Sequence, residues 1–375
     1  MKSRLDKHSR DTLRSFHAQI DADSPFFIGF PGSVDFDYSE LTPFFRYLLN
    51  NVGDPYEDPL HTNHSKHFEK EVINFFADMF RAPKNDRWGY VTNGGTEGNL
   101  YALYLARALH PKGVVYYTTS AHYSIPKNVQ ILAMESVVVE SQPNGEMDYK
   151  DFRKKVSRNR KRPAIIVATI GTTMTEAKDS VYIIRKILGD YSMQDVFVHC
   201  DAALAGVYTE YMLPHHPFDF ADGADSISIS GHKFIGSPMA CGVVITRKSY
   251  RDRVVRDSLY VGSPDSTISG SRNGHTPLML WYTIKKLGVD GLYSRALKSM
   301  ELARYLHTEL QYIGWTSWKN ENSFTVVIKK PPDAIVHKWQ LATYGEWSHI
   351  VCMPGVTQGQ LDKFVDDLKR SKHYK

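Results

Sequence analysis

The sequence predicts an α/β fold built on a largely parallel β-sheet with helices on both faces. Two observations lead to this prediction. Short β-branched runs alternate with helical stretches through the middle of the chain, and several of these runs are apolar throughout. Strands that are apolar on both faces are typical of a sheet covered by helices on each side. The length of 375 residues also leaves room for a second, smaller domain.

The first 60 residues are rich in aromatic side chains and interrupted by Pro and Gly, which favours an arm that wraps around something else over a closed unit. Next, residues 68–80 place apolar side chains at helical spacing, so they are expected to form a helix. Two further helices are expected, at 97–109 and 179–188. Strands are expected at 89–93, 113–120, 164–171, 195–203, 226–231 and 242–247.

From residue 276 the pattern indicates a smaller α/β lobe, with a helix through 292–310, a strand at 324–328 and an amphipathic helix at 360–368. The preceding stretch, 255–275, is rich in Ser, Gly and Asp and is expected to be a loop. We therefore expect three parts, namely an N-terminal arm (1–60), a large domain (61–275) and a small C-terminal domain (276–375).

Composition narrows the class of protein. The chain is 42% hydrophobic and 23% charged, which excludes wholesale disorder. Its net charge of +5 is too dilute for a dedicated nucleic-acid binder, and no apolar run is long enough to cross a membrane. The three cysteines form no CxxC pair and the N-terminus has no apolar signal region, so a cytoplasmic location is expected. His61, His64 and His67 lack nearby carboxylate or Cys partners, so no metal site is expected.

Two strand ends carry residues suited to a reactive carbonyl cofactor. Lys233 follows the apolar run at 226–231, and partial burial would lower the pKa of its amine, giving the neutral form that can form a Schiff base with an aldehyde. Taken alone, this peptide fits a surface lysine equally well. Asp201 ends another apolar strand, and its carboxylate would suit a ring nitrogen that must stay protonated. Taken alone, Asp201 also fits a helix cap.

Three further strand ends complete the pattern. Gly95 and Thr96 link a strand to a helix, and such a turn can bind phosphate through backbone N–H groups, although the spacing matches neither a P-loop nor a dinucleotide fold. Thr96 also fits a simple helix cap. His122 follows a strand and could stack on a planar ring, although taken alone a histidine of the core or the surface fits as well. Thr173, at a fifth strand end, supplies a hydroxyl.

These elements lie at the ends of predicted strands, and in open α/β sheets those ends converge on one crevice. A phosphate-binding turn, a stacking imidazole, a carboxylate for a ring nitrogen and a reactive amine together describe the binding site of pyridoxal 5′-phosphate. The convergence therefore favours a pyridoxal-phosphate enzyme over each of the separate structural interpretations.

Several ordered blocks support a specific family: WGYVTNGGTEGN, AHYSIPK, IGTTMTEAKD, HCDAALAG, SGHKFIGSP and SGSRNGHTPLMLW. On these blocks the chain resembles the pyridoxal-phosphate-dependent group II amino-acid decarboxylases, above all the bacterial histidine decarboxylases and plant serine decarboxylases. The resemblance covers nearly the whole chain. It implies a fold-type I homodimer with active sites at the subunit interface.

The resemblance also implies roles for single residues. Lys233 matches the Schiff-base lysine, Asp201 the partner of the ring nitrogen and His122 the imidazole that stacks on the ring near the substrate. Phosphate contacts are implied for Gly95, Thr96, Ser230 and His232, and contacts around the ring for Thr173 and Ala203. Tyr260 is implied as the proton donor by analogy with related decarboxylases, and Ser323 is assigned to the substrate site.

The implied reaction converts an amino acid into an amine and CO₂. The blocks ESQPNGEMDY, SGHKFIGSP and NENSFTVV are similar to the histidine enzymes, whereas KWQLA and IVCMPGVT are closer to the serine enzymes. Histidine is the favoured substrate and serine the alternative. A transaminase and a non-catalytic cofactor-binding protein remain as other classes.

Overall fold

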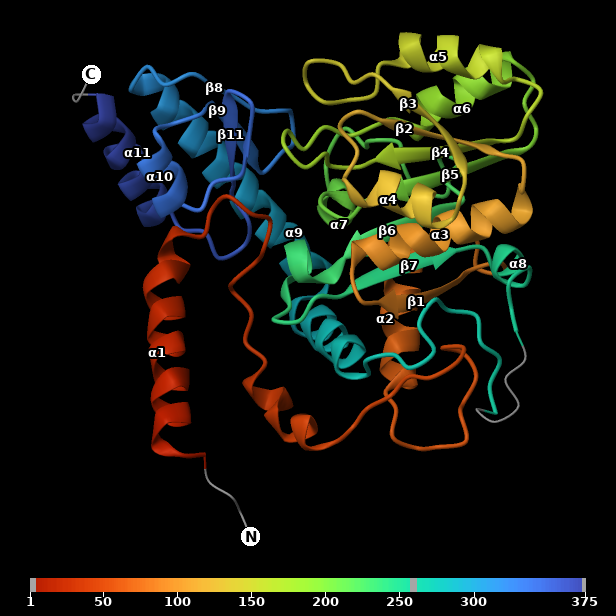
Figure 1. The fold of residues 1–375 in the computed structure, drawn as a ribbon, viewed down its shortest axis with the longest axis horizontal. Coiled ribbons are helices and arrows are strands. Elements are labelled where there is room, and N and C mark those ends of the chain that lie inside the picture. Colours follow the sequence, from red (N-terminus) through yellow and green to blue (C-terminus); the bar gives the residue numbers. More distant parts are fainter. Residues whose placement is uncertain (1–4, 257–261, 373–375) are drawn as a thin grey trace.

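A seven-stranded sheet forms the centre of the large part of the molecule (Figure 1). The computed structural model describes residues 5–256 and 262–372. Its strands are β1 (Trp88–Thr92), β2 (Val114–Thr118), β3 (Glu135–Val139), β4 (Ala164–Thr169), β5 (Val196–Asp201), β6 (Ser226–Ser230) and β7 (Gly242–Thr246). Their order is β1-β7-β6-β5-β4-β2-β3, with β7 antiparallel to both neighbours and the other pairs parallel. The predicted α/β class with a mostly parallel sheet is confirmed.

Helices cover both faces of this sheet. Those on one face are α2 (Lys66–Met79), α5 (Tyr149–Arg158) and α6 (Val181–Asp190), and those on the other are α3 (Gly95–Leu109) and α4 (Ser124–Ile131). In β4, Ile166 and Ala168 pack on the first set, whereas Ile165 and Val167 pack on the second. Because successive side chains point to opposite faces, a strand covered twice is buried at every position, as β4 is, and its residues from Ala164 to Ala168 are apolar.

Shorter elements complete the large part. They are η1 (Ser24–Phe26), η2 (Ser39–Arg46), α7 (Gly206–Thr209), η3 (Gly231–Gly236) and α8 (Lys248–Arg251). Of these, η3 matters most for the site because it directly follows β6 and contains Lys233.

A second, smaller sheet lies beside the large one, at the upper left of Figure 1. It has the order β10-β11-β9-β8 and is antiparallel throughout, with β8 (Ser317–Trp318), β9 (Thr325–Lys329), β10 (Thr343–Tyr344) and β11 (Trp347–Val351). Helices α10 (Asp333–Lys338) and α11 (Gln358–Lys372) accompany it. Leu306, Trp339 and Phe364 lie in its separate apolar core.

The long helix α9 (His275–Tyr312) connects the two parts. Its first half contributes Leu280 and Ile284 to the core of the large sheet, and its last turns contribute Leu306 and Leu310 to the core of the small one. The helix changes direction at Gly288, whose φ of 61° is readily adopted only by glycine. The predicted division into 1–60, 61–275 and 276–375 stays a prediction, and α9 begins within one residue of its second boundary.

The N-terminal segment begins with α1 (Lys7–Asp23), which extends away from the rest of the chain (Figure 1). None of its side chains is buried. The following residues cross between the two parts: Ile28 O accepts from Val351 N at 2.9 Å, and Ser33 N donates to Lys233 O at 3.3 Å. We call residues 28–38 the strap. The strap thus contacts both the small sheet and the turn that contains Lys233.

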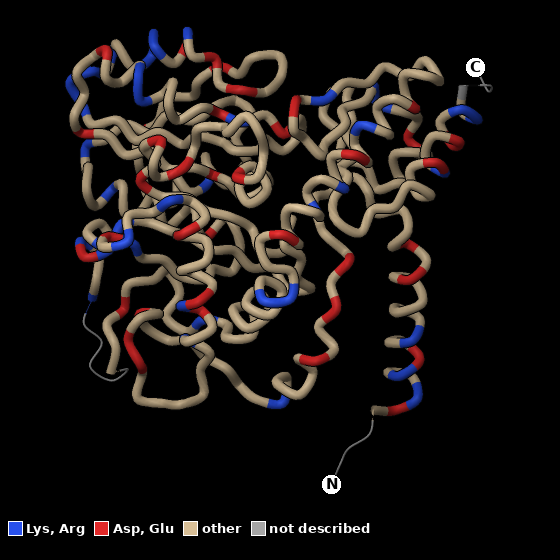
Figure 2. The backbone as a smooth tube through the Cα atoms, turned by 180° about the vertical axis from the view of Figure 1, so that it is seen from behind, with Lys and Arg blue, Asp and Glu red and all other residues tan. Residues whose placement is uncertain are grey.

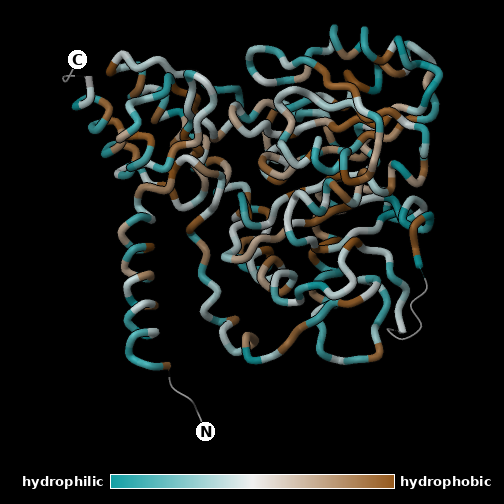
Figure 3. Tube along the Cα trace, viewed as in Figure 1, coloured by the Kyte–Doolittle hydropathy of each residue, from teal (hydrophilic) through white to brown (hydrophobic). Residues whose placement is uncertain are grey.

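Several elements lie outside the sequence predictions, for physical reasons that the structure makes visible. The sequence analysis did not predict α1, α4, α5 or β3. In α5 only Phe152 and Val156 are buried, so the helix is almost entirely polar, and Figure 3 shows it mostly in the hydrophilic colour. Strand β3 is an edge strand with exposed positions, which weakens the apolar signal.

Charged side chains are unevenly distributed along the protein, and its cysteines are unpaired. Figure 2 shows Lys and Arg gathered along α5, whereas α1 carries both signs. Cys200, Cys241 and Cys352 are buried and free of disulfide bonds. Within residues 5–256 and 262–372, no helix has the length and apolar character needed to span a membrane.

Candidate active site

The predicted site residues lie at one edge of the large sheet. Because β7 alone of its seven strands is reversed, the carboxyl ends of β1, β2, β4, β5 and β6 share this edge. Asp201 is the last residue of β5, and Lys233 lies in the turn after β6. His122 follows β2 and Thr173 follows β4, while Gly95 opens α3 after β1. The topology therefore gathers residues that are far apart in sequence.

Electrostatic coupling shows that three of these residues are neighbours. Burial lowers the pKa of the Lys233 amine, and the charge of Asp201 partly opposes this shift. Burial also lowers the pKa of the His122 imidazole, with Asp201 raising it and Lys233 lowering it further. Burial therefore shifts both groups towards their neutral forms.

The turn after β6 holds Lys233 in an unusual backbone conformation, with φ −86° and ψ −107°. Four successive carbonyl oxygens of this turn accept hydrogen bonds from residues outside it. The strap supplies Ser33 N to Lys233 O at 3.3 Å and Ser33 Oγ to Phe234 O at 3.2 Å. Arg295 Nη1 donates to Ile235 O at 2.9 Å, and Tyr38 Oη donates to Gly236 O at 2.6 Å. These bonds fix the turn from outside.

Asp201 is buried with 3% of its surface exposed, yet both carboxylate oxygens accept hydrogen bonds. Asn99 Nδ2 on α3 donates to Oδ2 at 2.9 Å, and the backbone N of Ala203 donates to Oδ1 at 3.3 Å. Hydrogen bonds of this kind favour the charged form of a carboxyl group. The carboxylate therefore suits a positively charged partner at the sheet edge.

The amino end of α3 has two features that suit an anion, namely open space and backbone N–H groups. Gly94 has φ 139°, and a Cβ placed on it would meet no atom within 4 Å, so open space adjoins it. The backbone N–H groups of Gly95 and Thr96 bond to no described residue. A Cβ on Gly95 would lie 2.8 Å from Ser230 Oγ and 3.1 Å from Ala203 Cβ, which places these predicted residues side by side. Free N–H groups at a helix start attract phosphate.

The two site histidines are each anchored through Nδ1. In His122, Nδ1 lies 2.8 Å from Ser124 Oγ and accepts from Ser124 N at 3.2 Å. In His232, Nδ1 lies 2.9 Å from the carbonyl oxygen of Cys241 and 3.2 Å from its backbone N. Burial lowers the pKa of His232. The Nε2 atom of each ring has no partner among the described residues.

Three predicted residues stand apart from this arrangement. Thr173 is exposed at the sheet edge. Ser323 is fully buried in the small part, where its Oγ donates to Thr325 O at 3.0 Å, and no hydrogen bond joins it to Lys233, Asp201 or His122. Tyr260 lies outside the described residues.

Sequence reasoning missed the residues that support Asp201 and Lys233. Asn99 follows Gly95 by four positions and so shares its helix face, a signal that was readable within EGN. Ser33, Tyr38 and Arg295 carry no such signal, because their contacts with the turn join segments 60 to 201 positions apart.

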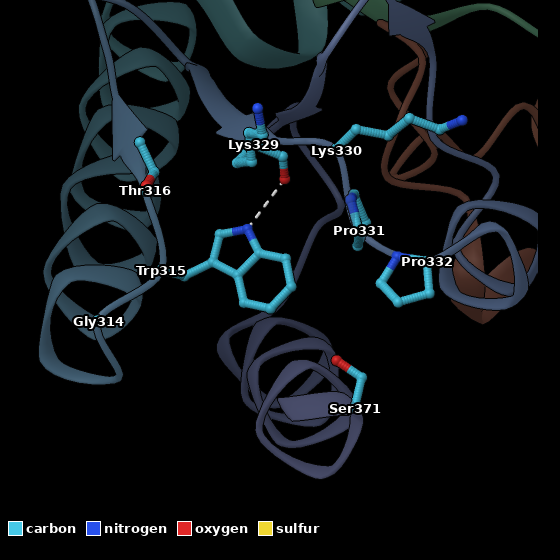
Figure 4. A pocket seen from close by; sticks show the side chains of 8 residues that line it. All are labelled: Gly314, Trp315, Thr316, Lys329, Lys330, Pro331, Pro332 and Ser371. Carbon is cyan, nitrogen blue, oxygen red and sulfur yellow. Dashed lines mark hydrogen bonds between the residues drawn. The ribbon is translucent and has the colours of Figure 1, made fainter. Parts of the chain in front are cut away.

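A surface pocket of about 570 Å³ lies in the small part, lined by Gly314, Trp315, Thr316, Lys329, Lys330, Pro331, Pro332 and Ser371 (Figure 4). None of these residues belongs to the sheet edge described above. Among the described residues, no three His, Cys, Asp or Glu side chains gather to hold a metal ion.

Comparison with known proteins identifies the family. A family model described as the pyridoxal-dependent decarboxylase conserved domain matches residues 62–329. The chain belongs to this family. It is 46% identical over 364 residues to a histidine decarboxylase of Mesorhizobium japonicum, an alignment that covers 97% of this chain and 98% of the relative. A histidine decarboxylase of Morganella morganii is 42% identical, with 97% of each chain covered.

A plant enzyme is similar as well. Serine decarboxylase 2 of Oryza sativa subsp. japonica is 42% identical over 351 residues, covering 93% of this chain and 75% of the relative. The fold resembles that of L-methionine decarboxylase from Streptomyces sp. 590, with a TM-score of 0.91, 23% identity and coverage of 99% and 96%. Glutamate decarboxylase of Lactobacillus brevis matches with a TM-score of 0.83, 19% identity and coverage of 100% and 93%. The fold-type I prediction is confirmed.

The protein is therefore a pyridoxal-phosphate-dependent carboxy-lyase that acts on an amino acid, as predicted. The residues present fit this cofactor. The open cradle at Gly94 has free N–H donors, and the buried amine of Lys233 lies within electrostatic reach of the Asp201 carboxylate. These are the groups that a phosphorylated pyridine aldehyde requires.

Proposed function

We propose that this decarboxylase converts L-histidine into histamine and CO₂. The observation that carries the proposal is the match, nearly end to end, with histidine decarboxylases at 46% and 42% identity. Serine is the second candidate, since the rice serine decarboxylase is 42% identical. The two substrates differ in the side chain that the pocket must hold, so the proposal concerns specificity and leaves the reaction type unchanged.

The proposed roles at the site follow from chemistry. Lys233 would hold the aldehyde of the cofactor, because burial keeps its amine available in the neutral form. Asp201 would face the ring nitrogen, and His122 would lie against the ring and the substrate. Phosphate would be held by Gly95, Thr96, Ser230 and His232, with Thr173 and Ala203 near the ring. When bound, pyridoxal phosphate supplies a protonated ring that accepts the electron pair released as CO₂ leaves.

Two further residues are proposed to act on the substrate. Ser323 is proposed to contact substrate, and its neighbour Phe324 packs on Tyr208 with ring centroids 3.9 Å apart. Tyr260 is proposed to return the proton to Cα, on the grounds of family resemblance alone. Neither assignment changes the roles of Lys233 and Asp201.

We also propose a cytoplasmic homodimer with active sites at the subunit interface. The dimer is supported by α1, which has no buried side chain and whose exposed Leu13, Phe16 and Ile20 form an apolar stripe. It is also supported by the exposure of Thr173 beside the site. A reducing compartment is supported by the three buried, unpaired cysteines. The division into arm, large domain and small domain, at residues 60 and 275, belongs to the same proposal.

The substrate is tested by incubating the holoenzyme with a panel of L-amino acids that includes histidine, serine, methionine, glutamate and tryptophan. We expect CO₂ and histamine from histidine, with kcat/KM for histidine above that for serine by about tenfold or more, a difference of about 1.4 kcal/mol.

Each other outcome overturns a named part of the proposal. If the enzyme turns over serine faster than histidine, serine is its substrate and the histidine proposal is wrong. A keto acid in place of CO₂ indicates a transaminase. Bound cofactor without turnover of any amino acid indicates a non-catalytic protein.

A further inference from the structure

A chain of buried polar groups runs from β6 through β5 and α3 to Asp201. Ser226 Oγ lies 2.9 Å from His199 Nδ1, His199 Nε2 lies 2.9 Å from Asn99 Oδ1, and Asn99 Nδ2 lies 2.9 Å from Asp201 Oδ2. Ser226 and His199 are fully buried, and Asn99 is 1% exposed. Each link is therefore shielded from water.

The Asp201 carboxylate determines which group donates in every hydrogen bond of this series. A carboxylate only accepts hydrogen bonds, so the Asn99 amide must turn its NH₂ group towards Asp201 and its oxygen towards His199. His199 must then donate from Nε2, which leaves Nδ1 to accept from the Ser226 hydroxyl. Burial lowers the pKa of His199 to about 4, so the ring is neutral and able to do both.

The packing of α3 on β6 brings Asn99 to this place. A Cβ on Gly98 would lie 2.1 Å from Ser228 Oγ, so only glycine allows the helix to approach the strand this closely. About one turn earlier, a Cβ on Gly95 would lie 2.8 Å from Ser230 Oγ, so the helix approaches β6 closely there as well. Asn99 directly follows Gly98, so it lies close to the end of β5, where its Nδ2 donates to Asp201.

We propose that Asn99, supported by His199 and Ser226, is a positioning residue that orients the Asp201 carboxylate towards the ring nitrogen of the cofactor. The proposal rests on the proposed role of Asp201. Asn99 holds Oδ2 from the helix side, so the carboxylate cannot rotate freely. Without the amide, this buried carboxylate oxygen loses its donor and its fixed orientation towards the ring nitrogen.

The test compares variants by two measurements that do not depend on turnover. One is the dissociation constant of pyridoxal 5′-phosphate from the protein. The other is the chemical shift of the ring nitrogen in bound ¹⁵N-labelled cofactor, which reports whether that nitrogen is protonated. The variants are Asn99→Leu, which removes both links, and Ser226→Ala, which removes only the outermost one.

The matched control is Asn51→Leu. Asn51 is also fully buried, and its Nδ2 donates to a buried carboxylate oxygen of Glu69 at 2.8 Å, away from Asp201. This control reproduces the loss of a buried amide–carboxylate bond. A purely structural effect would therefore move the melting temperature of both variants alike and leave the ring-nitrogen signal of both unchanged.

We expect Asn99→Leu to weaken cofactor binding by about tenfold or more, the factor for one hydrogen bond to a charged group. We also expect it to move the ring-nitrogen shift towards the unprotonated position. Ser226→Ala should change both in the same direction but less, and it decides the matter if Asn99→Leu does not fold. A ring-nitrogen signal equal to wild type in the folded variants overturns the proposal.

The role of Asp201 itself is separated by Asp201→Asn. If Asp201→Asn shifts the ring-nitrogen signal and Asn99→Leu does not, only the positioning role of Asn99 fails. If Asp201→Asn also leaves the signal unchanged, the proposed role of Asp201 fails and the inference falls with it.

Discussion

At the scale of single residues, the site depends on burying groups that usually prefer water. Lys233 is an amine in a largely dry environment, and burial rather than any neighbour is the main cause of its lowered pKa. The nearby Asp201 limits that shift and provides the compensating charge. A lysine placed this way is suited to react with a carbonyl group, because the neutral amine is the nucleophile.

Lys233→Ala should abolish covalent attachment of the cofactor and reduce decarboxylation by several orders of magnitude, because no other amine replaces it at the sheet edge. The measurement is mass spectrometry after borohydride reduction of the holoenzyme, together with the absorbance near 420 nm.

The control for this experiment is Lys127→Ala, which removes an exposed lysine on α4 beside the His122 loop. It should retain the attached cofactor mass. Retention of that mass in Lys233→Ala would refute the assignment of Lys233.

At the scale of elements, the start of α3 depends on a glycine conformation. Gly94 adopts φ 139° and ψ 172°, a backbone conformation that residues other than glycine rarely adopt. After this turn, the N–H groups of Gly95 and Thr96 donate to no residue in the described part of the chain. The turn therefore creates the cradle through backbone geometry, without any charged side chain.

Gly94→Ala should reduce the free energy of unfolding by about 1–3 kcal/mol because of backbone strain, although space for the methyl group exists. It should also weaken binding of pyridoxal 5′-phosphate. Urea denaturation and a cofactor titration measure the two effects.

Gly189→Ala on α6 is the matched control, since its Cβ also meets nothing within 4 Å and its φ lies outside the left-handed region. Its stability should stay equal or rise slightly, because alanine favours a helix. Equal behaviour of the two variants would contradict the argument from backbone conformation.

At the scale of the whole molecule, two parts with separate cores are held against each other by buried polar contacts. Glu176, in the loop after β4, accepts from Phe324 N at 2.9 Å and from Thr325 Oγ1 at 2.6 Å. The strap adds a second connection through Ile28 and Ser33. By contrast, α1 has no such anchoring, and its apolar stripe is exposed by 57% at Leu13, 60% at Phe16 and 47% at Ile20.

Phe16→Glu should weaken self-association by about tenfold to a hundredfold, the equivalent of about 1.5–3 kcal/mol for losing one buried aromatic side chain. Sedimentation velocity across a range of concentrations measures it. Ala18→Glu, on the opposite face of α1 at about 100° of rotation per residue, should leave association unchanged. A monomeric wild type, or equal dimerisation of both variants, would rule out the proposed role of α1.

Much of the fold was predictable because it depends on local patterns. The doubly covered strands are apolar at nearly every position, and the helices at 66–79 and 95–109 repeat with helical period. The candidate site residues Lys233, Asp201 and His122 were predictable because each lies at or just after the end of a strand. Helix α5 was not readable, because only Phe152 and Val156 of its residues pack inward.

The sequence alone predicted an α/β pyridoxal-phosphate enzyme with its candidate site residues at strand ends, because strand patterns and strand-end chemistry are properties of short segments. The decarboxylase reaction was predicted from the resemblance to a known family. Only the tertiary structure decided which groups hold those residues in place. Tyr38 reaches Gly236 across 198 positions, and Asn99 reaches Asp201 across 102. Such contacts depend on how strands are ordered and how closely helices pack on them, which no local pattern encodes.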